Sequence, residues 1–192
     1  MAAELAFGLP GANLDPVVVA LPDGRAVRFR GKADRVDETA DGSLRVIDYK
    51  TGKREPYTSL SEANPDDGGQ LLQLPVYGAA ARAMRDRPDA AVDADYWFTS
   101  VATRPRIGFP VTAMVMARFS ETLQAIVSGI EAGTFPNHPV AASTSPKWGC
   151  QYCDPDRLGV TELRAGWDRK RADPALAGYA DRVEPAGAAP DA

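Results

Sequence analysis

Hydrophobic and polar residues alternate in three stretches near the start of the chain. Residues 17–21 form an apolar, β-branched run, residues 26–37 alternate apolar with basic side chains, and residues 44–51 are apolar at every second position or more. A period of two is typical of strands, and the turn-forming segments 22–24 and 41–42 separate the runs. The pattern therefore predicts an antiparallel meander of three strands.

The rest of the chain favours helices with two further strands between them. Leu, Ala and Gln dominate residues 70–84, with Pro75 expected in the first helical turn or at a bend. Apolar residues from Phe119 to Ile130 follow helical spacing, and Gly133 is a natural stop for this helix. The expected elements are helices at 4–7, 70–84, 119–130 and 161–172, strands at 95–101 and 109–113, and a loop at 53–69.

This order of elements predicts an α/β (α+β) fold class, with helices around one mixed sheet. The length of 192 residues suits one domain of ordinary size. We expect that domain to span residues 1–172. Residues 173–192 are rich in Ala, Pro and Asp and are expected to form a disordered tail.

The composition narrows the function classes. A net charge of -4 and a pI of about 5.1 do not suit a domain that grips nucleic acid by itself, so DNA contacts must come from a local basic patch or a partner. His138 is the single histidine, which disfavours a Ser-His-Asp enzyme and a multi-histidine zinc site. No apolar run is long enough for a membrane span and no signal peptide is recognisable, so we expect a cytoplasmic protein without membrane contacts.

The candidate chemistry lies on the second and third predicted strands. Asp48 and Lys50 are two residues apart, so their side chains leave the strand on the same face. If Val36 pairs with Val46, Asp34 lies opposite Asp48, with Cβ atoms roughly 5 Å apart. Two carboxylates and one ammonium group then converge on one spot.

Two interpretations of this convergence remain open. Opposed carboxylates repel each other, so the pair favours either a raised pKa or a bound cation. Oxygen ligands suit a hard ion such as Mg²⁺ or Mn²⁺, whose bound water can attack a phosphate while a lysine stabilises the developing charge. The alternative is a surface salt-bridge cluster without catalytic function.

Several segments together resemble a known family. They are Gly31-x-x-Asp34-Arg35-x-Asp37, Ile47 to Gly52, Gln73 to Tyr77, Ala132 to Pro136, and Cys150-x-x-Cys153. In this order they are similar to motifs of the PD-(D/E)xK nuclease superfamily, in its RecB/AddB-like exonuclease branch. The resemblance runs from about Glu4 to Ala172 and implies a restriction-endonuclease-like core, a mixed central sheet flanked by helices.

The resemblance implies roles for individual residues. Asp34, Asp48 and the backbone carbonyl of Tyr49 would bind the metal ion, Lys50 would be the catalytic lysine, and Glu4 would be a further ligand or a structural acid. Four residues apart on one helix, Gln73 and Tyr77 would share a face toward the active site or the DNA, although Tyr77 also suits a core position.

Basic residues near the site are candidates for DNA contact. They are Arg35, Lys53 and Arg54, and Arg35 is also placed to pair with Asp37 or another acid. A cluster of charges is also typical of a solvated surface.

The sequence departs from this branch in two places. Relatives carry a histidine on a helix upstream of the sheet, whereas nothing here precedes Met1, so the domain is expected to be N-terminally truncated. Many relatives also hold an iron–sulfur cluster with four cysteines, but here Gly159 occupies the third C-terminal position and the upstream cysteine is absent. We therefore expect no cluster, with Cys150 and Cys153 as a remnant of the site or as free thiols.

Taken together, the sequence predicts a Mg²⁺- or Mn²⁺-dependent DNA exonuclease domain. It would act on single strands or duplex ends with a helicase domain or subunit, in repair and recombination of double-strand breaks. One alternative is a non-catalytic DNA-binding scaffold on the same fold. Another is a nuclease of the CRISPR-adaptation type, which shares the Gln-Tyr motif and the cysteines.

Overall fold

The computed structural model describes residues 2–103, 105–136, 138 and 159–184. By its internal contacts the chain divides into two compact units, Met1–Gln124 and Ala125–Ala192. The first unit contains a five-stranded sheet and all the strands on which the candidate chemistry lies. Within the described residues, no helix is long and apolar enough to cross a membrane.

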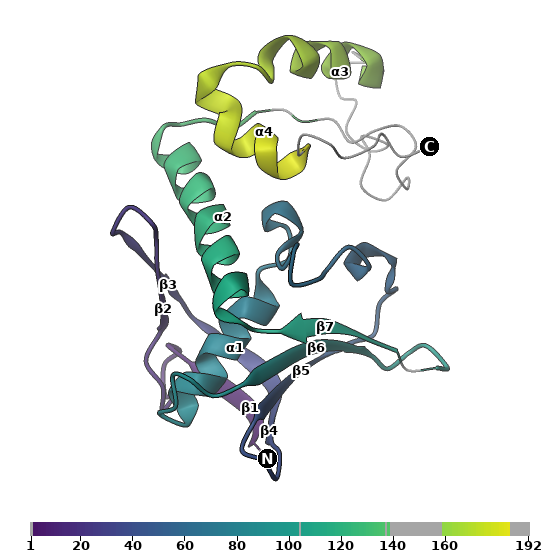
Figure 1. The fold of residues 1–192 in the computed structure, drawn as a ribbon. Helices are drawn as coiled ribbons and strands as arrows, with labels where there is room; N and C mark the ends of the chain where they lie inside the picture. Colours follow the sequence, from purple (N-terminus) through teal and green to yellow (C-terminus); the bar gives the residue numbers. More distant parts are fainter. Residues whose placement is uncertain (1, 104, 137, 139–158, 185–192) are drawn as a thin grey trace. The chain divides into compact units, whose positions relative to one another are not determined.

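The central sheet of the first unit is mixed. Its strand order is β1-β4-β5-β6-β7, in which β5 and β6 are parallel and the other neighbours are antiparallel (Figure 1). The helix α1 connects the two parallel strands, as a parallel pair requires. This arrangement confirms the expected α/β class. The bounds are β1 Ala2–Phe7, β4 Gly31–Glu38, β5 Leu44–Lys50, β6 Val92–Phe98, β7 Arg106–Pro110 and α1 Gln73–Met84.

The first element differs from the expectation. The helix predicted at Glu4 to Phe7 is wrong, because these residues belong to β1, which pairs antiparallel with β4. Leu5 and Phe7 alternate with exposed or half-buried positions and are buried in the core. Pairing with a distant strand therefore outweighs the local preference of this short segment.

The predicted three-stranded meander is also wrong. The strand expected at residues 26–37 is split into β3 (Ala26–Phe29) and β4, and β3 pairs only with β2 (Val17–Ala20) in a separate two-stranded sheet. The split falls beside Gly31, which lies opposite Phe7. A Cβ atom there would lie 3.0 Å from Phe7 Cζ, so the phenyl ring packs directly over the glycine backbone at the start of β4.

Helix α1 forms where the composition predicts it. Pro75 lies within its first turn, where the absent N–H removes no helical hydrogen bond. The residues Leu74, Ala80 and Ala81 are fully buried, and the helix contacts β5 and β6. At Gly78 a Cβ atom would lie 2.8 Å from a methyl group of Val111, so a glycine is needed for this close approach.

The strand β6 shows how the sheet is divided into two faces. Val92, Ala94, Tyr96 and Phe98 are buried, and the residues between them are only half-buried. Because Tyr96 contacts Gln73 of α1, the buried series faces the helix. The opposite face presents Trp97, which packs against Tyr49 and Arg106 of the neighbouring strands.

The segment between β5 and α1, predicted as a loop, contains two short 3-10 helices. They are η1 (Glu55–Tyr57) and η2 (Asp67–Gly69). The predicted strand partners at residues 95–101 and 109–113 correspond to β6 and β7, which pair antiparallel. The helix α2 (Ala113–Glu131) ends close to Gly133, whose φ of +66° matches the predicted stop.

In the second unit, α3 (Gly159–Lys170) corresponds to the predicted helix at 161–172. The described part of the predicted tail, residues 173–184, contains η4 (Pro174–Leu176) and α4 (Ala177–Val183), and the disorder of residues 173–192 stays a prediction. The side chain of Asp173 caps η4 by accepting a hydrogen bond from Ala175 N at 2.9 Å. Trp167 and Tyr179 pack edge to face, with ring centroids 5.8 Å apart, which gives this segment an apolar contact.

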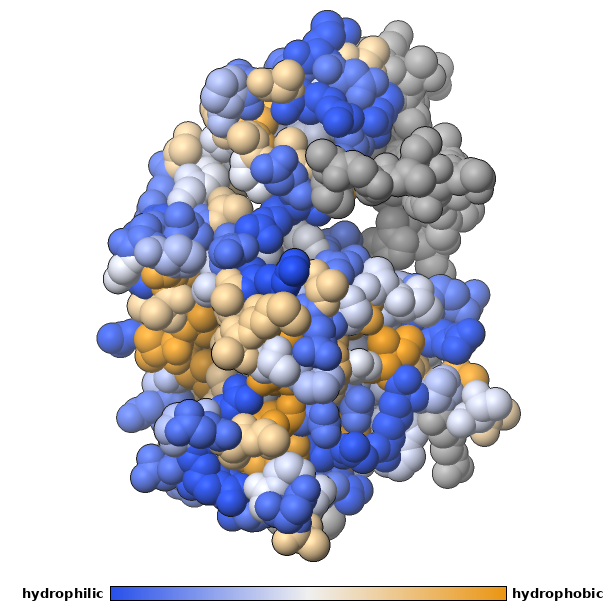
Figure 2. Space-filling view, viewed as in Figure 1, coloured by the Kyte–Doolittle hydropathy of each residue, from blue (hydrophilic) through white to orange (hydrophobic). Residues whose placement is uncertain are grey.

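The face of the molecule seen in Figure 2 is mostly hydrophilic, with hydrophobic residues showing between the polar ones. The large apolar residues that remain exposed are scattered over different elements, for example Val18 on β2 and Met114 on α2. Single exposed apolar residues of this kind are ordinary and do not define a site.

Candidate active site

Asp34 and Asp48 meet where β4 and β5 separate. The two strands pair from Glu38↔Leu44 to Arg35↔Ile47, with Val36 opposite Val46, and the ladder ends there. This register places Asp34 across from Asp48. The next backbone donor, Tyr49 N, donates to Asp34 Oδ2 at 2.8 Å, so a side-chain carboxylate takes the place of a ladder acceptor.

Asp48 and Lys50 form a close ion pair on the face of β5 that points toward α1. Lys50 Nζ lies 2.6 Å from Asp48 Oδ2, and Asp48 is only 5% exposed. The contact is not an aligned hydrogen bond, and Oδ2 has no other donor among the described residues. A buried carboxylate oxygen with unused lone pairs is costly unless a cation or a proton joins it.

Gln73, the first residue of α1, holds the other side of Lys50. Its Oε1 accepts from Lys50 Nζ at 2.9 Å and from the Tyr96 hydroxyl at 3.3 Å. Its Nε2 donates to the Tyr77 hydroxyl at 3.2 Å, one helical turn further on. Two donors at the oxygen and one acceptor at the nitrogen fix the orientation of the amide.

Two tyrosines that sequence analysis missed also lie beside Lys50. Its Nζ is 4.7 Å from the ring centroid of Tyr96 and 6.0 Å from that of Tyr57. Tyr96 lies beside Asp48 in the parallel register of β5 and β6, so a correct strand pairing would have predicted it. Tyr57 comes from η1, and no pattern in the sequence indicates its position.

The electrostatics of the site oppose a second negative charge. Burial raises the pKa of Asp48, the Lys50 ammonium lowers it, and the charge of Asp34 raises it again, so the pKa is raised overall. Burial also raises the pKa of Tyr77, and the charges of Asp48 and Asp34 add to this effect. The pKa of the Tyr96 hydroxyl is raised by burial first and by the charge of Asp48 second, so this group stays protonated. All three shifts arise first from burial, which disfavours further negative charge on these groups.

The donor set fits a small divalent cation. Asp34 and Asp48 offer two carboxylates, and Mg²⁺ is commonly held by one or two carboxylates with water completing its shell. The buried Asp48 Oδ2, which lacks an aligned donor, is the observation that supports this fit. Within the described part of the chain there is no group of three His, Cys, Asp or Glu side chains that could hold a metal ion by themselves.

Glu4 lies close to this site in the strand register but makes a different contact. It falls between the pairs Ala3↔Arg35 and Leu5↔Ala33, so its backbone lies across from that of Asp34. Its backbone has a φ of +59°, and its carboxylate pairs with Lys32 at 2.9 Å. Its role as a metal ligand stays a prediction, as does that of the Tyr49 carbonyl.

The three basic residues expected to contact DNA lie in two places. Arg35 is on the opposite face of the sheet, where it forms a two-point contact with Asp37 at 2.8 and 3.0 Å and reaches the Tyr49 hydroxyl at 3.4 Å. The predicted pairing with Asp37 is therefore present. Lys53 and Arg54 are separated from β5 by Thr51 and Gly52 and are exposed, and neither forms an ion pair within the described residues. Cys150 and Cys153 lie outside the described residues.

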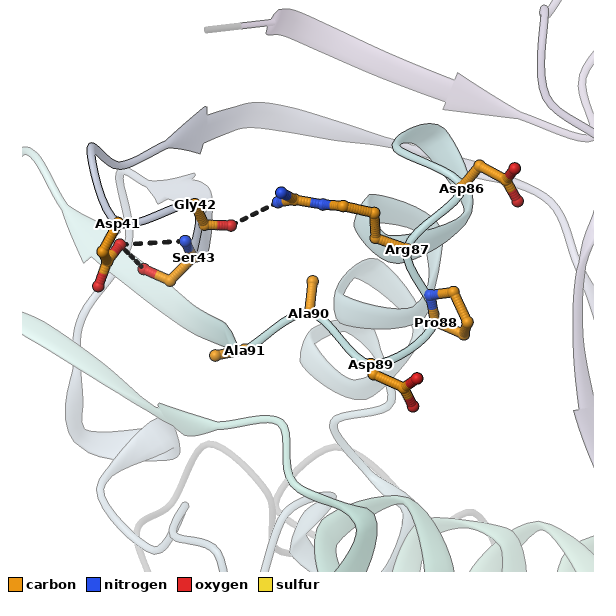
Figure 3. A pocket seen from close by; sticks show the side chains of 9 residues that line it. All are labelled: Asp41, Gly42, Ser43, Asp86, Arg87, Pro88, Asp89, Ala90 and Ala91. Carbon is orange, nitrogen blue, oxygen red and sulfur yellow. Dashed lines mark hydrogen bonds between the residues drawn. The ribbon is translucent and has the colours of Figure 1, made fainter.

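A hollow of about 550 Å³ lies at the other end of β5, away from Lys50. It is formed by the turn between β4 and β5 and by the loop after α1 (Figure 3). Arg87 donates to the carbonyl of Gly42 across it, and hydrogen bonds within the turn lower the pKa of Asp41 to about 2. These contacts join two loops, and the hollow contains none of the candidate catalytic residues.

Comparison with known proteins gives one family match and several relatives. A family model described as the PD-(D/E)XK nuclease superfamily matches residues 1–158. Similar curated proteins are named as one of the subunits of an ATP-dependent helicase/deoxyribonuclease. The protein of Symbiobacterium thermophilum is 49% identical over 59 residues, which is 29% of this chain and 5% of that protein.

Two further relatives carry the same name. The protein of Clostridium tetani is 46% identical over 79 residues, and that of Alkaliphilus metalliredigens is 37% identical over 81 residues. Each match covers 40% of this chain and 6% of the relative. The matched segment is thus a small part of much longer proteins.

Proposed function

We propose, since the chain belongs to the PD-(D/E)XK nuclease superfamily, that Asp34, Asp48 and Lys50 hydrolyse phosphodiester bonds of DNA with a divalent metal ion. The observation that carries the proposal is the convergence of the three side chains where β4 and β5 separate. A buried carboxylate without an aligned donor and a half-buried ammonium group then lie side by side.

Each residue has a distinct role in this proposal. Asp34 and Asp48 would hold Mg²⁺ or Mn²⁺, which when bound supplies a Lewis acid and lowers the pKa of a water molecule. Lys50 is a compact point charge that would stabilise negative charge on a phosphate oxygen. Gln73 keeps the Lys50 ammonium at the site through the contact of 2.9 Å, and Tyr77 in turn supports Gln73.

The kind of DNA that this domain cleaves is inferred from the names of its relatives. Their name joins a helicase to a deoxyribonuclease. We infer that this domain acts on DNA ends as an exonuclease, on strands delivered by a helicase domain or subunit, and serves repair of double-strand breaks. The exposed Lys53 and Arg54, which lie shortly after the end of β5, are suited to bind the phosphate backbone of DNA.

The test compares four proteins on end-labelled single-stranded DNA with Mg²⁺ or Mn²⁺. Asp48→Ala and Lys50→Ala should lose at least about a hundredfold in rate, because the first removes a metal ligand and the second removes the charge that stabilises the reacting phosphate. Asp93→Ala is the matched control, since Asp93 lies on β6 with its side chain half exposed and paired with Arg45 on the other face of the sheet.

Two outcomes would overturn the proposal. If Asp48→Ala and Lys50→Ala cleave as fast as the parent and the control, the active-site assignment is wrong. If the parent binds DNA but cleaves with neither metal, the domain is a binding module. A closed circular single strand, which lacks ends, should resist cleavage if the domain is an exonuclease.

A further inference from the structure

The Lys50 ammonium group is held from three directions. Asp48 Oδ2 lies 2.6 Å away on one side and Gln73 Oε1 2.9 Å away on another. The third direction is closed by two aromatic rings, Tyr96 at 4.7 Å and Tyr57 at 6.0 Å from Nζ to the ring centroid. An ammonium group within about 6 Å of a ring centroid is attracted by the negative face of the ring.

These partners differ in how they respond to a cation bound at Asp48. A metal ion would repel the ammonium and compete for Asp48 Oδ2, which weakens the ion pair. The amide of Gln73 and the two rings carry no net charge, so their attraction for Lys50 remains. Lysine has a flexible four-carbon stem with considerable rotamer entropy, so partners that a metal ion does not displace can restrict its position.

Tyr57 is held in position independently of Lys50. Its ring contacts Tyr96 and Phe98 edge to face, with centroid distances of 4.8 and 5.3 Å. Those two residues are buried at the end of β6, where the parallel register places Phe98 beside Lys50. Pro56, which precedes Tyr57, restricts the backbone of η1. The ring therefore closes the site from a segment that lies outside the sheet.

We propose that Tyr57 is a positioning residue for Lys50, which keeps the ammonium over the site when a metal ion occupies Asp34 and Asp48. The inference rests on the proposed nuclease function. The competing explanation is that Tyr57 only fills space over β6. The two explanations differ in whether the loss of the ring changes Lys50.

Cleavage kinetics test the role in catalysis. Tyr57→Leu should lower kcat by between about 2-fold and 30-fold, the range that corresponds to a cation–π attraction, and leave KM for the DNA strand unchanged. Tyr57→Phe keeps the ring and should retain the parent kcat. Ser59→Ala is the control for the same segment, because Ser59 is exposed. Equal losses in the Leu and Phe variants would contradict the proposal.

A second readout requires neither metal nor activity. In protein labelled with ¹³C-lysine, the Cε protons of Lys50 should be shifted upfield by the rings, as assigned from the Lys50→Arg variant. Tyr57→Leu should move this signal to the position of a solvated lysine, which requires that Lys50 also leaves the Tyr96 ring, now 4.7 Å from Nζ, and Tyr57→Phe should not. A Lys50 signal that keeps the upfield shift from Tyr96 in Tyr57→Leu overturns the proposal, because Lys50 has then not moved.

The two readouts separate this inference from the proposed function. If the parent does not cleave DNA, the nuclease assignment fails, and the lysine spectrum still decides whether Tyr57 holds Lys50. If the parent cleaves and Tyr57→Leu has the parent kcat, the positioning role alone is wrong. Should the Leu variant not fold, Tyr57→Met, which fills the gap with a flexible apolar chain, takes its place with the same expected results.

Discussion

Replacement of Gln73 by leucine would remove the centre of the network around Lys50. Three hydrogen bonds would be lost: from Lys50 Nζ at 2.9 Å, from the Tyr96 hydroxyl at 3.3 Å, and to the Tyr77 hydroxyl at 3.2 Å. Leucine has nearly the same size as glutamine, so the packing of α1 against β6 changes little. The free energy of unfolding therefore reports on the polar contacts.

The loss of unfolding free energy in Gln73→Leu depends on which of the three partners can form a hydrogen bond with water instead. Tyr96 is 0% exposed, so its hydroxyl loses its acceptor without replacement, at a cost of about 1–3 kcal/mol. The Lys50 side chain is 20% exposed and regains part of its hydrogen bonding from solvent. With a smaller contribution from Tyr77, the loss in unfolding free energy should be roughly 3 kcal/mol.

A double-variant cycle isolates the orphaned hydroxyl. Tyr96→Phe removes that group, so the Gln73→Leu/Tyr96→Phe variant contains no unsatisfied donor at this point. Its unfolding free energy should exceed that expected from the two single variants by about 1 kcal/mol or more. Hydrogen exchange of the β5 and β6 amides during urea unfolding, without metal, gives the stability of the first unit by itself.

The outcome that refutes this reasoning is additivity. If the double variant loses the sum of the two single losses within about 0.5 kcal/mol, Tyr96 and Gln73 are not coupled. The hydroxyl would then have another acceptor in solution, and Gln73 would not be the centre of the network.

Three further predictions concern other parts of the chain. Mg²⁺ at ten times its Kd should raise the unfolding free energy of the parent by about 1.4 kcal/mol, measured by thermal melting. Asp48→Asn should lose most of this increase, and an equal increase in both proteins would exclude Asp48 as a ligand. Gly108→Ala should destabilise the first unit by roughly 3 kcal/mol in urea, because its Cβ would lie 2.0 Å from the Ala94 carbonyl oxygen; an unchanged midpoint would contradict this contact. Burial alone would raise the pKa of Glu184, but hydrogen bonds from His138 and neighbouring groups lower it to about 2. The Glu184 carboxylate should therefore stabilise the folded state fully above about pH 4.5, and this stabilisation should fade as the pH falls toward 2. Trp167 fluorescence between these values should show a smaller pH dependence in Glu184→Gln, and an identical profile would disprove the assignment.

Local patterns were sufficient for the elements whose signals are strong. The Leu/Ala-rich run of α1 and the alternation in β5 predicted both elements within a few residues, because each has one clear face. The register of Val36 with Val46 was an assumption from the sequence, and the structure shows this pair. These were the elements from which the convergence of Asp34, Asp48 and Lys50 could be inferred.

The errors arose where long-range pairing decides the structure. β1 is a strand because β4 offers it an edge, and no local signal indicates that partner. β3 and β4 separate because β3 pairs with β2 whereas β4 pairs with β1 and β5, and these partners are not visible in the local pattern. Tyr57 was missed for the same reason, since its place beside Lys50 depends on the path of the chain after β5.

Side chains of β5 alternate between the two faces of the sheet, and this alternation limits how the length of the strand can change. Asp48 and Lys50 point to α1, and Tyr49 points to the opposite face, where it meets Trp97. Insertion or deletion of one residue within the strand would exchange the two series and place Ile47 or Tyr49 where the Asp48 carboxylate now lies. Length changes between Thr39 and Ser43 would leave this order intact, since the turn lies before the strand. Among homologues, gaps should therefore fall in that turn and be absent from Leu44 to Lys50.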